Sequence, residues 1–237
     1  MNPRASISVA NLGVVDYAAA LRLQTALVAL RHEEKIGDTI LLMEHPHVFT
    51  LGRGADERFI VANPNHVPTF RVSRGGQVTY HGPGQLIGYP ILKLEGRARD
   101  VSKYLRDLEQ SMIDALREFN IDASHRDGLT GVWVGARKIA SIGVGIRRWV
   151  TYHGFAINVR TDLSYFDAIV PCGIEGCRMT SVAECSRTDV SMSEFAAAIA
   201  SSFARVFNYE SSVSLDAQQI WQLIDSAAAE SEAQSPR

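Results

Sequence analysis

Residues 74–90 read Arg-Gly-Gly-Gln-Val-Thr-Tyr-His-Gly-Pro-Gly-Gln-Leu-Ile-Gly-Tyr-Pro and contain five glycines and two prolines. Ordering a glycine costs more backbone entropy than ordering any other residue, so an ordinary strand or helix does not contain so many. Such a run is useful where the backbone must approach a ligand closely or adopt positive φ. The segment is therefore predicted to be a ligand-binding loop, with Tyr80 and His81 near its centre.

This glycine-rich segment does not match the common phosphate-binding motifs. No Gly-Lys-Ser/Thr follows Gly76, as a Walker loop requires, and no G-x-G-x-x-G opens a helix. An anion site remains open, because Arg74 and neighbouring backbone N–H groups can form a concave nest of donors.

The flanking sequence predicts several short strands and a few longer helices. Asp16, Asp100 and Ser191 are predicted N-caps, and Ser191 also begins a capping box. Strands are predicted at residues 39–43, 48–51, 70–73, 88–94, 131–134, 138–146 and 150–159, the last two forming a hairpin, and helices at 17–34, 101–116, 191–207 and 215–224.

Helices and strands mix without strict alternation along the chain. This pattern favours an α/β (α+β) fold, a single domain with a mixed β-sheet flanked by helices, over a doubly wound sheet. The predicted domain covers residues 1–225. Residues 226–237 are polar and rich in Ala, Ser and Glu, and are predicted to form a disordered tail.

The overall composition excludes several classes of protein. A chain of 237 residues with 46% hydrophobic residues can bury a full core, and its net charge of −2 argues against a nucleic-acid binder. No apolar run approaches the roughly 18 residues of a membrane span. Residues 1–10 lack the pattern of a signal peptide. Three cysteines, an odd number, do not form a disulfide framework, which favours a reducing, cytoplasmic location.

Cys172 is a candidate nucleophile because of its two neighbours. Pro171 stiffens the approach to the cysteine and Gly173 leaves room around the sulfur. A nucleophilic thiol also needs a nearby cation or base, because the thiolate is the reactive form. A structural cysteine in a tight turn is the alternative, and these residues alone leave both interpretations open.

The remaining cysteines and histidines do not form a recognisable metal site or hydrolase site. Cys172 and Cys177 have C-x4-C spacing, whereas zinc sites more often use C-x2-C with a nearby histidine. No histidine follows His153. A papain-like thiol hydrolase is disfavoured for the same reason, because its histidine follows the cysteine. His45 and His47 have no obvious third ligand.

Lys138 opens an apolar segment and can therefore be partly desolvated. Its ammonium group could stabilise a neighbouring thiolate, and its neutral form could accept the thiol proton. A solvated lysine at the end of a strand is the alternative. His81 likewise could orient a substrate, or could simply bind the backbone of its own loop.

Together these segments resemble the lipoyl(octanoyl) transferases, a family of octanoyl-[acyl-carrier-protein]:protein N-octanoyltransferases. The likeness extends from about residue 14 to 207 and rests on four motifs in order. They are residues 74–85, 135–143 (Gly-Ala-Arg-Lys-Ile-Ala-Ser-Ile-Gly), 152–158 (Tyr-His-Gly-Phe-Ala-Ile-Asn) and 171–173 (Pro-Cys-Gly), supported by residues 45–46 and 50–53.

This resemblance implies a fold like the catalytic domain of biotin/lipoate protein ligases and assigns roles to particular residues. Cys172 corresponds to the nucleophile and Lys138 to the lysine that activates it and transfers protons. The segments that correspond to the acyl pocket contain Arg74, Gly75, Gly76, Gln77, Val78, Thr79, Tyr80, His81, Ser141, Ile142, Gly143, Gly154, Phe155 and Ala156.

The resemblance also implies the reaction and its partners. The donor is an octanoyl (or lipoyl) thioester on the phosphopantetheine of acyl carrier protein. The acceptor is a lysine in the lipoyl domains of 2-oxoacid dehydrogenase E2 subunits or in glycine cleavage protein H. Transfer through a cysteine acyl-enzyme requires no further cofactor and no metal, and it is the first step of protein lipoylation. From charge alone, Arg53, Arg147 or Arg148 is a candidate docking residue for the acidic carrier protein.

Two rival functions remain open from the sequence. One is an ATP-dependent lipoate or biotin protein ligase of the same fold, because residues 51–54 (Leu-Gly-Arg-Gly) faintly resemble an adenylate-binding segment. Such a ligase would not need Cys172. The other is a non-catalytic binder of acyl groups or anions, in which Cys172 and Lys138 have no chemical role.

Overall fold

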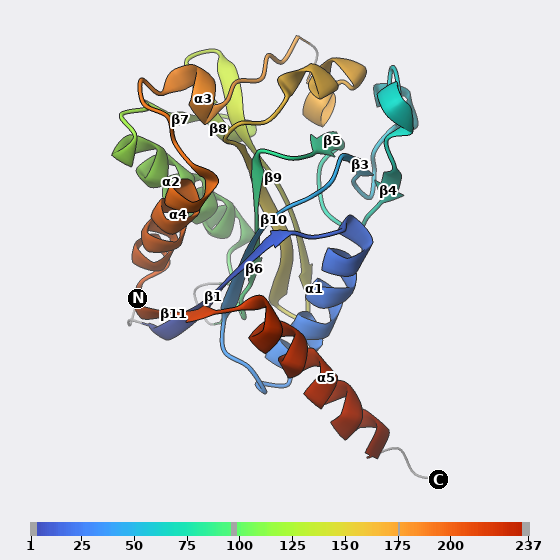
Figure 1. The fold of residues 1–237 in the computed structure, drawn as a ribbon, viewed down its shortest axis with the longest axis vertical. Coiled ribbons are helices and arrows are strands. Elements are labelled where there is room, and N and C mark those ends of the chain that lie inside the picture. The colour runs from blue at the N-terminus through green and yellow to red at the C-terminus, as the bar shows by residue number, and fades with distance from the viewer. Residues whose placement is uncertain (1–3, 96–98, 175, 234–237) are drawn as a thin grey trace.

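The computed structural model describes residues 4–95, 99–174 and 176–233, arranged around one large sheet with helices on both faces (Figure 1). Side chains at positions 4, 5, 172, 225 and 227–233 are outside this description. The sheet has eight strands in the order β11-β1-β2-β6-β10-β9-β8-β7. Their bounds are β1 Arg4–Val14, β2 Thr39–Glu44, β6 Gln85–Ile91, β7 Ser124–Arg126, β8 Leu129–Val134, β9 Arg137–Arg147, β10 Val150–Asn158 and β11 Tyr209–Leu215.

The sheet is mixed, as the sequence predicts. Strand β1 pairs in parallel with β2 and β11, whereas β2, β6, β10, β9, β8 and β7 follow one another in antiparallel pairs. The predicted fold class is therefore confirmed. Strands β1, β7 and β11 were not predicted, because β1 and β11 contain many small polar residues and β7 has only three residues.

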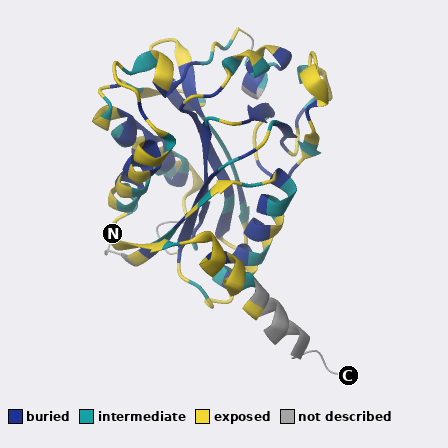
Figure 2. Ribbon diagram, viewed as in Figure 1, coloured by how far each residue is buried: buried dark blue, intermediate teal, exposed yellow. Residues whose placement is uncertain are grey.

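Helices cover both faces of this sheet and bury its side chains (Figures 1 and 2). Helix α1 (Tyr17–His32) and α5 (Ala217–Ala233) lie on one side, and α2 (Val101–Glu118) and α4 (Met192–Val206) lie on the other. Leu23 and Leu27 of α1, like Leu108 and Met112 of α2, are fully buried against the strands. A single helical turn, α3 (Val182–Cys185), follows the candidate cysteine.

The predicted helix starts are confirmed by their caps. The side chain of Asp16 accepts a hydrogen bond from the N–H of Ala19, and Asp100 accepts from the N–H of Lys103. The capping box at Ser191 is also present, with Glu194 reaching back to the N-cap. These caps fix where the three main helices begin.

The prediction of a loop between the strands at 70–73 and 88–94 is wrong for two parts of the segment. Residues 78–81 form strand β5 (Val78–His81), which pairs with β3 (Val48–Leu51), and β3 also pairs with β4 (Thr69–Arg71). Strand β6 begins at Gln85. The glycines therefore mark the turns on either side of β5, and the small three-stranded sheet holds the first of these turns, residues 74–77, against the large sheet.

The predicted hairpin between β9 and β10 is confirmed. Arg147 pairs with Val150, so only Arg148 and Trp149 form the turn, with φ angles of 51° and 64°. Two consecutive positive φ angles are typical of a type I′ turn, whose twist matches that of the strands.

The C-terminal segment includes the residues for which the sequence predicts a disordered tail. Helix α5 continues through Ala233, so most of residues 226–237 is helical, and residues 234–237 lie outside the described part of the chain. Elsewhere, irregular segments contain short 3₁₀ turns, η1 (Glu57–Phe59), η2 (Pro64–His66), η4 (Leu163–Ala168) and η5 (Pro171–Gly173). Within the described residues, no helix has both the length and the apolar character that crossing a bilayer would require.

Candidate active site

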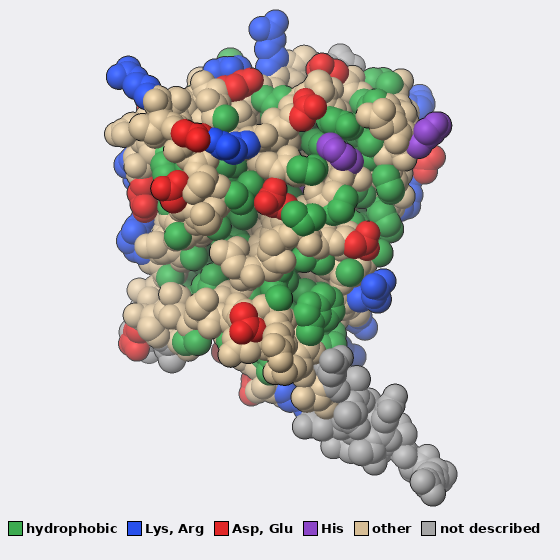
Figure 3. All heavy atoms as spheres, viewed as in Figure 1, with side chains coloured by type: hydrophobic (Ala, Val, Ile, Leu, Met, Phe, Trp, Pro, Cys, Tyr) green, Lys and Arg blue, Asp and Glu red, His purple; other side chains and the backbone are tan. Residues whose placement is uncertain are grey.

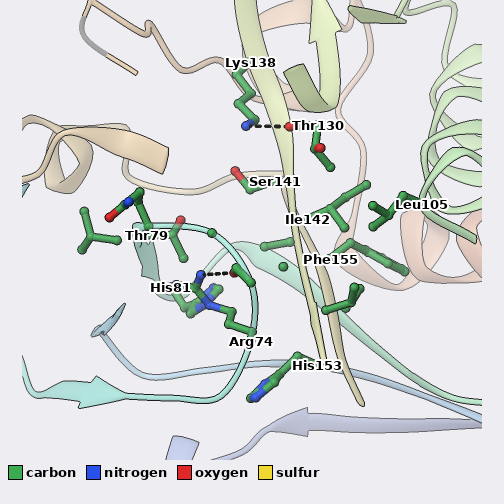
Figure 4. Close-up of a pocket in the computed structure, with 18 of the residues that line it drawn as sticks. Arg74, Thr79, His81, Leu105, Thr130, Lys138, Ser141, Ile142, His153 and Phe155 are labelled. Atoms are coloured by element: carbon green, nitrogen blue, oxygen red, sulfur yellow. Dashed lines mark hydrogen bonds between the residues drawn. The ribbon is translucent and has the colours of Figure 1, made fainter. Parts of the chain in front are cut away.

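A cavity of about 350 Å³ lies between residues 74–79 and strands β9 and β10. This volume is within the range of roughly 300–1,000 Å³ that small-molecule sites occupy. The residues that line the cavity include both polar and apolar side chains (Figure 4). Thr79, His81 and Arg74 lie on one side of β9 and β10, and Ile142, Leu105 and Phe155 lie on the other.

The structure gathers most of the predicted pocket residues around this cavity. They come from three separate parts of the chain, and tertiary packing brings them together. Those that line the cavity are Arg74, Gly75, Gly76, Gln77, Val78, Thr79, His81, Lys138, Ser141, Ile142, Gly143, Gly154, Phe155 and Ala156.

Tyr80 is the predicted pocket residue that does not line the cavity. Neighbouring side chains of a strand point to opposite faces, so Tyr80 points away from the cavity that Thr79 and His81 reach. Its ring packs in the core of the small sheet, and its hydroxyl is 2.7 Å from His47 Nδ1. Tyr80, which the family resemblance assigned to the acyl pocket, therefore does not line this cavity.

Several lining residues were not predicted. Tyr17 of α1, Leu105 of α2 and His153 of β10 are far apart in the sequence, and no local pattern connects them to residues 74–81. The unpredicted lining residues are Tyr17, Tyr89, Leu105, Gly128, Leu129, Thr130, Val144, His153 and Ile174.

Lys138 is buried at one end of the cavity. Only 1% of its surface is exposed, and its Nζ donates a 3.0 Å hydrogen bond to the carbonyl oxygen of Thr130. The ammonium group also lies 5.4 Å from the centre of the Trp133 ring. The sequence alone was compatible with either a desolvated or a solvent-exposed Lys138. The burial of Lys138 excludes the solvent-exposed alternative.

The room for this lysine comes from a glycine on the next strand. A Cβ atom at Gly131 would lie 2.6 Å from Cε of Lys138, and Gly131 has a φ of 125°. No other residue type could occupy position 131 without displacing the lysine or straining the backbone. Gly131 is thus a site residue that the sequence did not reveal, although its place before an apolar strand was visible.

The turn that carries Cys172 also borders the cavity. Residues 171–173 form a 3₁₀ turn closed by hydrogen bonds from Gly173 N–H to Val170 and from Ile174 N–H to Pro171. A Cβ atom at Gly173 would approach Cγ of Gln77 to 2.9 Å, so this turn packs directly on the glycine-rich segment. Gln77 and Ile174 both line the cavity, whereas the side chain of Cys172 lies outside the described part of the structure.

The chain just after this turn pairs with the backbone of Lys138. The N–H of Lys138 donates to the carbonyl of Arg178 at 2.8 Å, and the N–H of Thr180 donates to the carbonyl of Lys138 at 2.9 Å. The segment that follows Cys172 is therefore attached to strand β9 at Lys138 itself. This attachment brings together two motifs that are 34 residues apart in the sequence.

Hydrogen bonds connect Arg74 with the buried His81. Arg74 Nη2 donates to the hydroxyl oxygen of Thr50 at 2.8 Å, and this hydroxyl lies 3.3 Å from His81 Nε2. His81 Nδ1 lies 2.8 Å from the amide oxygen of Gln85. That oxygen can only accept, so Nδ1 carries the proton and Nε2 accepts from Thr50. Burial lowers the pKa of His81 to about 3, so the ring is neutral near pH 7.

The same set of hydrogen bonds continues to the segment that pairs with Lys138. Gln85 Nε2 donates to Asn158 Oδ1 at 2.9 Å, and Asn158 Nδ2 donates to the carbonyl of Thr180 at 3.0 Å. Gln85 and Asn158 are each only 1% exposed. His81, which the sequence left as either a substrate-orienting or a loop histidine, thus belongs to a buried set of bonds that links the glycine-rich segment to residues 178–180.

Aromatic rings surround the other end of the cavity. Tyr17 stacks on His81 with an interplanar angle of 11°, and the hydroxyl of Tyr89 donates a 2.8 Å hydrogen bond to His45 Nε2. His45 Nδ1 donates a 2.7 Å hydrogen bond to the carbonyl of Val15. Both ring nitrogens of His45 therefore have protein partners.

The other two cysteines do not line this cavity. Cys185 Sγ lies 3.3 Å from the hydroxyl of Thr180, and Cys177 is half-buried. Over the described residues, no cluster of three or more His, Cys, Asp or Glu side chains could hold a metal ion.

Comparison with known proteins identifies the family. Residues 16–204 match the model of the lipoyl protein ligase A/B catalytic domain. The chain belongs to this family. An octanoyltransferase of Solibacter usitatus is 50% identical over 204 residues, covering 84% of this chain and 92% of its own. An octanoyltransferase of Gloeobacter violaceus is 46% identical, covering 84% and 89%.

Solved structures of the family share the fold. A lipoate protein ligase from T. acidophilum with bound lipoic acid has a TM-score of 0.70 and 17% identity, covering 93% of this chain and 94% of its own. Lipoate-protein ligase A bound with ATP has a TM-score of 0.68 and 18% identity, covering 94% of each chain. At such low identity this likeness shows the fold alone. The relatives of high identity are octanoyltransferases, so the predicted family resemblance is confirmed and the protein is an acyltransferase.

Proposed function

We propose that this protein transfers an octanoyl group from acyl carrier protein to a lysine of a lipoyl domain, with Cys172 as the covalent carrier. Octanoyl transfer is the activity of the curated relatives. One observation supports the site assignment most directly. The segment that follows Cys172 pairs with the backbone of Lys138, and the turn at 171–173 and the buried lysine border one cavity.

The proposed first step is a thioester exchange. The Cys172 thiolate attacks the carbonyl carbon of the octanoyl thioester, the new S–C bond forms, and the bond to the pantetheine sulfur breaks. The departing thiolate takes up a proton. Thiol and thioester occur on both sides of this step, so it is nearly balanced in free energy and requires no nucleotide.

The proposed second step forms an amide. The amine of the acceptor lysine attacks the acyl carbon on Cys172, loses a proton, and releases the Cys172 thiolate. Lys138 would donate or accept the proton in both steps, and this assignment is supported by its Nζ, which the carbonyl of Thr130 holds at the cavity. The conversion of a thioester to an amide is downhill, so no ATP or metal is involved.

The acyl chain would bind in the cavity along β9 and β10. Burying about seven methylene-type groups at roughly 0.8 kcal/mol each contributes on the order of 5 kcal/mol. Phe155, Ala156 and Ile142 offer apolar surface for this chain. Chain-length preference would then depend on how far the cavity extends from Lys138.

The acyl-enzyme can be tested by intact-mass spectrometry. The enzyme is mixed with octanoyl carrier protein without an acceptor, and the mass should increase by one octanoyl group. Cys172→Ala should give no adduct, whereas Cys177→Ser and Cys185→Ser should acylate like the parent. If amide product forms at the normal rate with Cys172→Ala, the covalent route is wrong.

A transferase and the rival ligase can be distinguished by the acyl donor that each one uses. A transferase should modify an apo lipoyl domain from octanoyl carrier protein without nucleotide and should not use ATP with free octanoate. Modification that requires ATP and free octanoate, and that survives Cys172→Ala, would identify a ligase instead.

A further inference from the structure

The end of the cavity opposite Lys138 contains a buried polar atom that the proposed octanoyl substrate would not satisfy. His153 lines the cavity and only 2% of its surface is exposed. Its Nε2 is buried without a hydrogen-bond partner among the described residues. Buried polar side-chain atoms almost always have a partner, so an unpaired one inside a ligand cavity points to a ligand atom.

The backbone fixes His153 in this position. It has a φ of 53°, and its N–H donates a 2.7 Å hydrogen bond to Oε1 of Gln24, a fully buried residue of α1. The left-handed conformation turns the side chain out of the regular alternation of β10. Burial, followed by the positive charge of Arg74, lowers the pKa of His153 to about 4, so the ring is neutral near pH 7.

His153 lies one acyl chain length from the proposed chemistry. It pairs with Val144 on β9, three residues beyond Ser141, which is about 10 Å along a strand. Figure 4 shows the amine of Lys138 directed toward Ser141, and His153 at the opposite end of the lining residues. An extended chain advances about 3.6 Å for every three bonds, so an octanoyl thioester also spans about 10 Å.

We infer that His153 determines specificity by recognising a hydrogen-bonding atom at the far end of an eight-carbon acyl chain. This inference depends on the proposed acyl transfer and extends it to a substrate class, the ω-hydroxylated medium-chain thioesters. A neutral imidazole presents Nε2 either as a donor or as an acceptor, and a hydroxyl group satisfies both forms. A methyl terminus satisfies neither, so octanoyl binding leaves Nε2 of His153 without a partner.

The test compares octanoyl and 8-hydroxyoctanoyl carrier protein as donors to an apo lipoyl domain. The wild-type enzyme should use both, and His153→Phe should lower the kcat/KM ratio of hydroxyoctanoyl to octanoyl about tenfold or more, as expected for an unpaired hydroxyl. His153→Asn, which tolerates positive φ and keeps a hydrogen-bonding group, should retain more of the wild-type ratio. His125→Phe, at an exposed position, is the matched control and should not change the ratio.

The outcomes separate the two proposals. An unchanged ratio in a folded His153→Phe variant that still transfers octanoyl would overturn the role of His153 and leave the transferase intact. Failure of the wild type with both donors would instead count against the proposed function. If His153→Phe does not fold, ¹⁵N-histidine NMR of the wild-type acyl-enzyme gives the answer. The His153 Nε2 resonance should differ between the two acyl chains, and identical spectra would contradict the inference.

Discussion

Gly131 and Lys138 lie on neighbouring strands so close together that a Cβ atom at Gly131 would be 2.6 Å from Cε of the lysine. The lysine can be buried here because Gly131 has no side chain. Its Nζ then reaches the carbonyl of Thr130, the residue before this glycine. The position of the proposed proton-transfer group therefore depends on one glycine in β8.

Gly131→Ala should displace the amine of Lys138 and lower kcat by about 10²-fold, because small misplacements of a reacting group have such effects. The matched control is Gly135→Ala. Gly135 also has positive φ, 56°, but nothing lies within 4 Å of its Cβ position. Both variants should lose about 1–3 kcal/mol of stability from backbone strain, and Gly131→Ala should lose more because its Cβ also meets the carbonyl oxygen of Ala140 at 2.6 Å. Only Gly131→Ala should lose activity. Equal activity in the two variants would show that the close contact does not matter.

Lys138→Met should reduce transfer by about 10²–10⁴-fold, the usual contribution of a positioned proton-transfer group. Lys138→Arg should not restore activity, because a guanidinium does not transfer protons near neutral pH. Steady-state assays with octanoyl carrier protein measure both. Lys103→Met removes a partly exposed lysine that pairs with Asp107 on α2, and it should retain full activity.

Asn158→Leu should destabilise the protein and weaken catalysis together. Asn158 accepts from Gln85 and donates to the carbonyl of Thr180. The change removes both bonds and leaves Gln85 Nε2 with its bond to the carbonyl of Tyr80, so it should cost about 1–3 kcal/mol. Urea unfolding measures the stability. A lower kcat would indicate that residues 178–180 no longer hold their position beside Lys138. Asn11→Leu changes an exposed position of β1 and should alter neither. Unchanged kcat in Asn158→Leu would show that these bonds support the fold alone.

Stability should fall as the pH decreases from about 6.5 toward 4. Burial lowers the pKa of His45 to about 4, of His81 to about 3 and of His153 to about 4, from an ordinary 6.5. In this window the unfolded chain binds protons that the folded chain does not, so acid favours unfolding. Each ring contributes up to about 1.4 kcal/mol per pH unit. Urea unfolding at several pH values should show a shallower slope for His81→Gln than for the wild type, and parallel slopes would contradict this account.

The structure changes the prediction for carrier-protein docking. Arg147 and Arg148 lie at the hairpin, nine residues along β9 from Lys138, which is about 30 Å. Arg53 is exposed and its N–H donates to the carbonyl of Arg74, beside the cavity. Arg53→Glu should therefore raise KM for octanoyl carrier protein at low salt, whereas Arg147→Glu and Arg148→Glu should change it little. Figure 3 shows basic and acidic groups interspersed over the visible face. Because no single charge dominates this face, one arginine beside the cavity can affect carrier-protein binding. A larger effect at the hairpin than at Arg53 would reverse this assignment.

Much of the fold could be predicted because its signals are local. Asp16, Asp100 and Ser191 begin helices by capping their own first turns, and the apolar runs around Ile139 and Ile157 form the central strands. Strand β5 was missed because its four residues lie between two glycine turns, and its pairing partner is β3, about 30 residues earlier in the chain. Strand pairing over that separation leaves no mark in the local composition.

For the site, the sequence by itself determined which candidate groups are present, since the resemblance to the octanoyltransferases rests on the segments that contain Cys172, Lys138 and the glycine-rich residues 74–85. Only the tertiary structure decided their environment. The burial of Lys138 requires the empty space at Gly131, the neutrality of His81 requires its enclosure, and His153 enters the cavity because α1 holds its backbone. These properties arise from desolvation and close packing between distant segments, which exist only after the chain has folded.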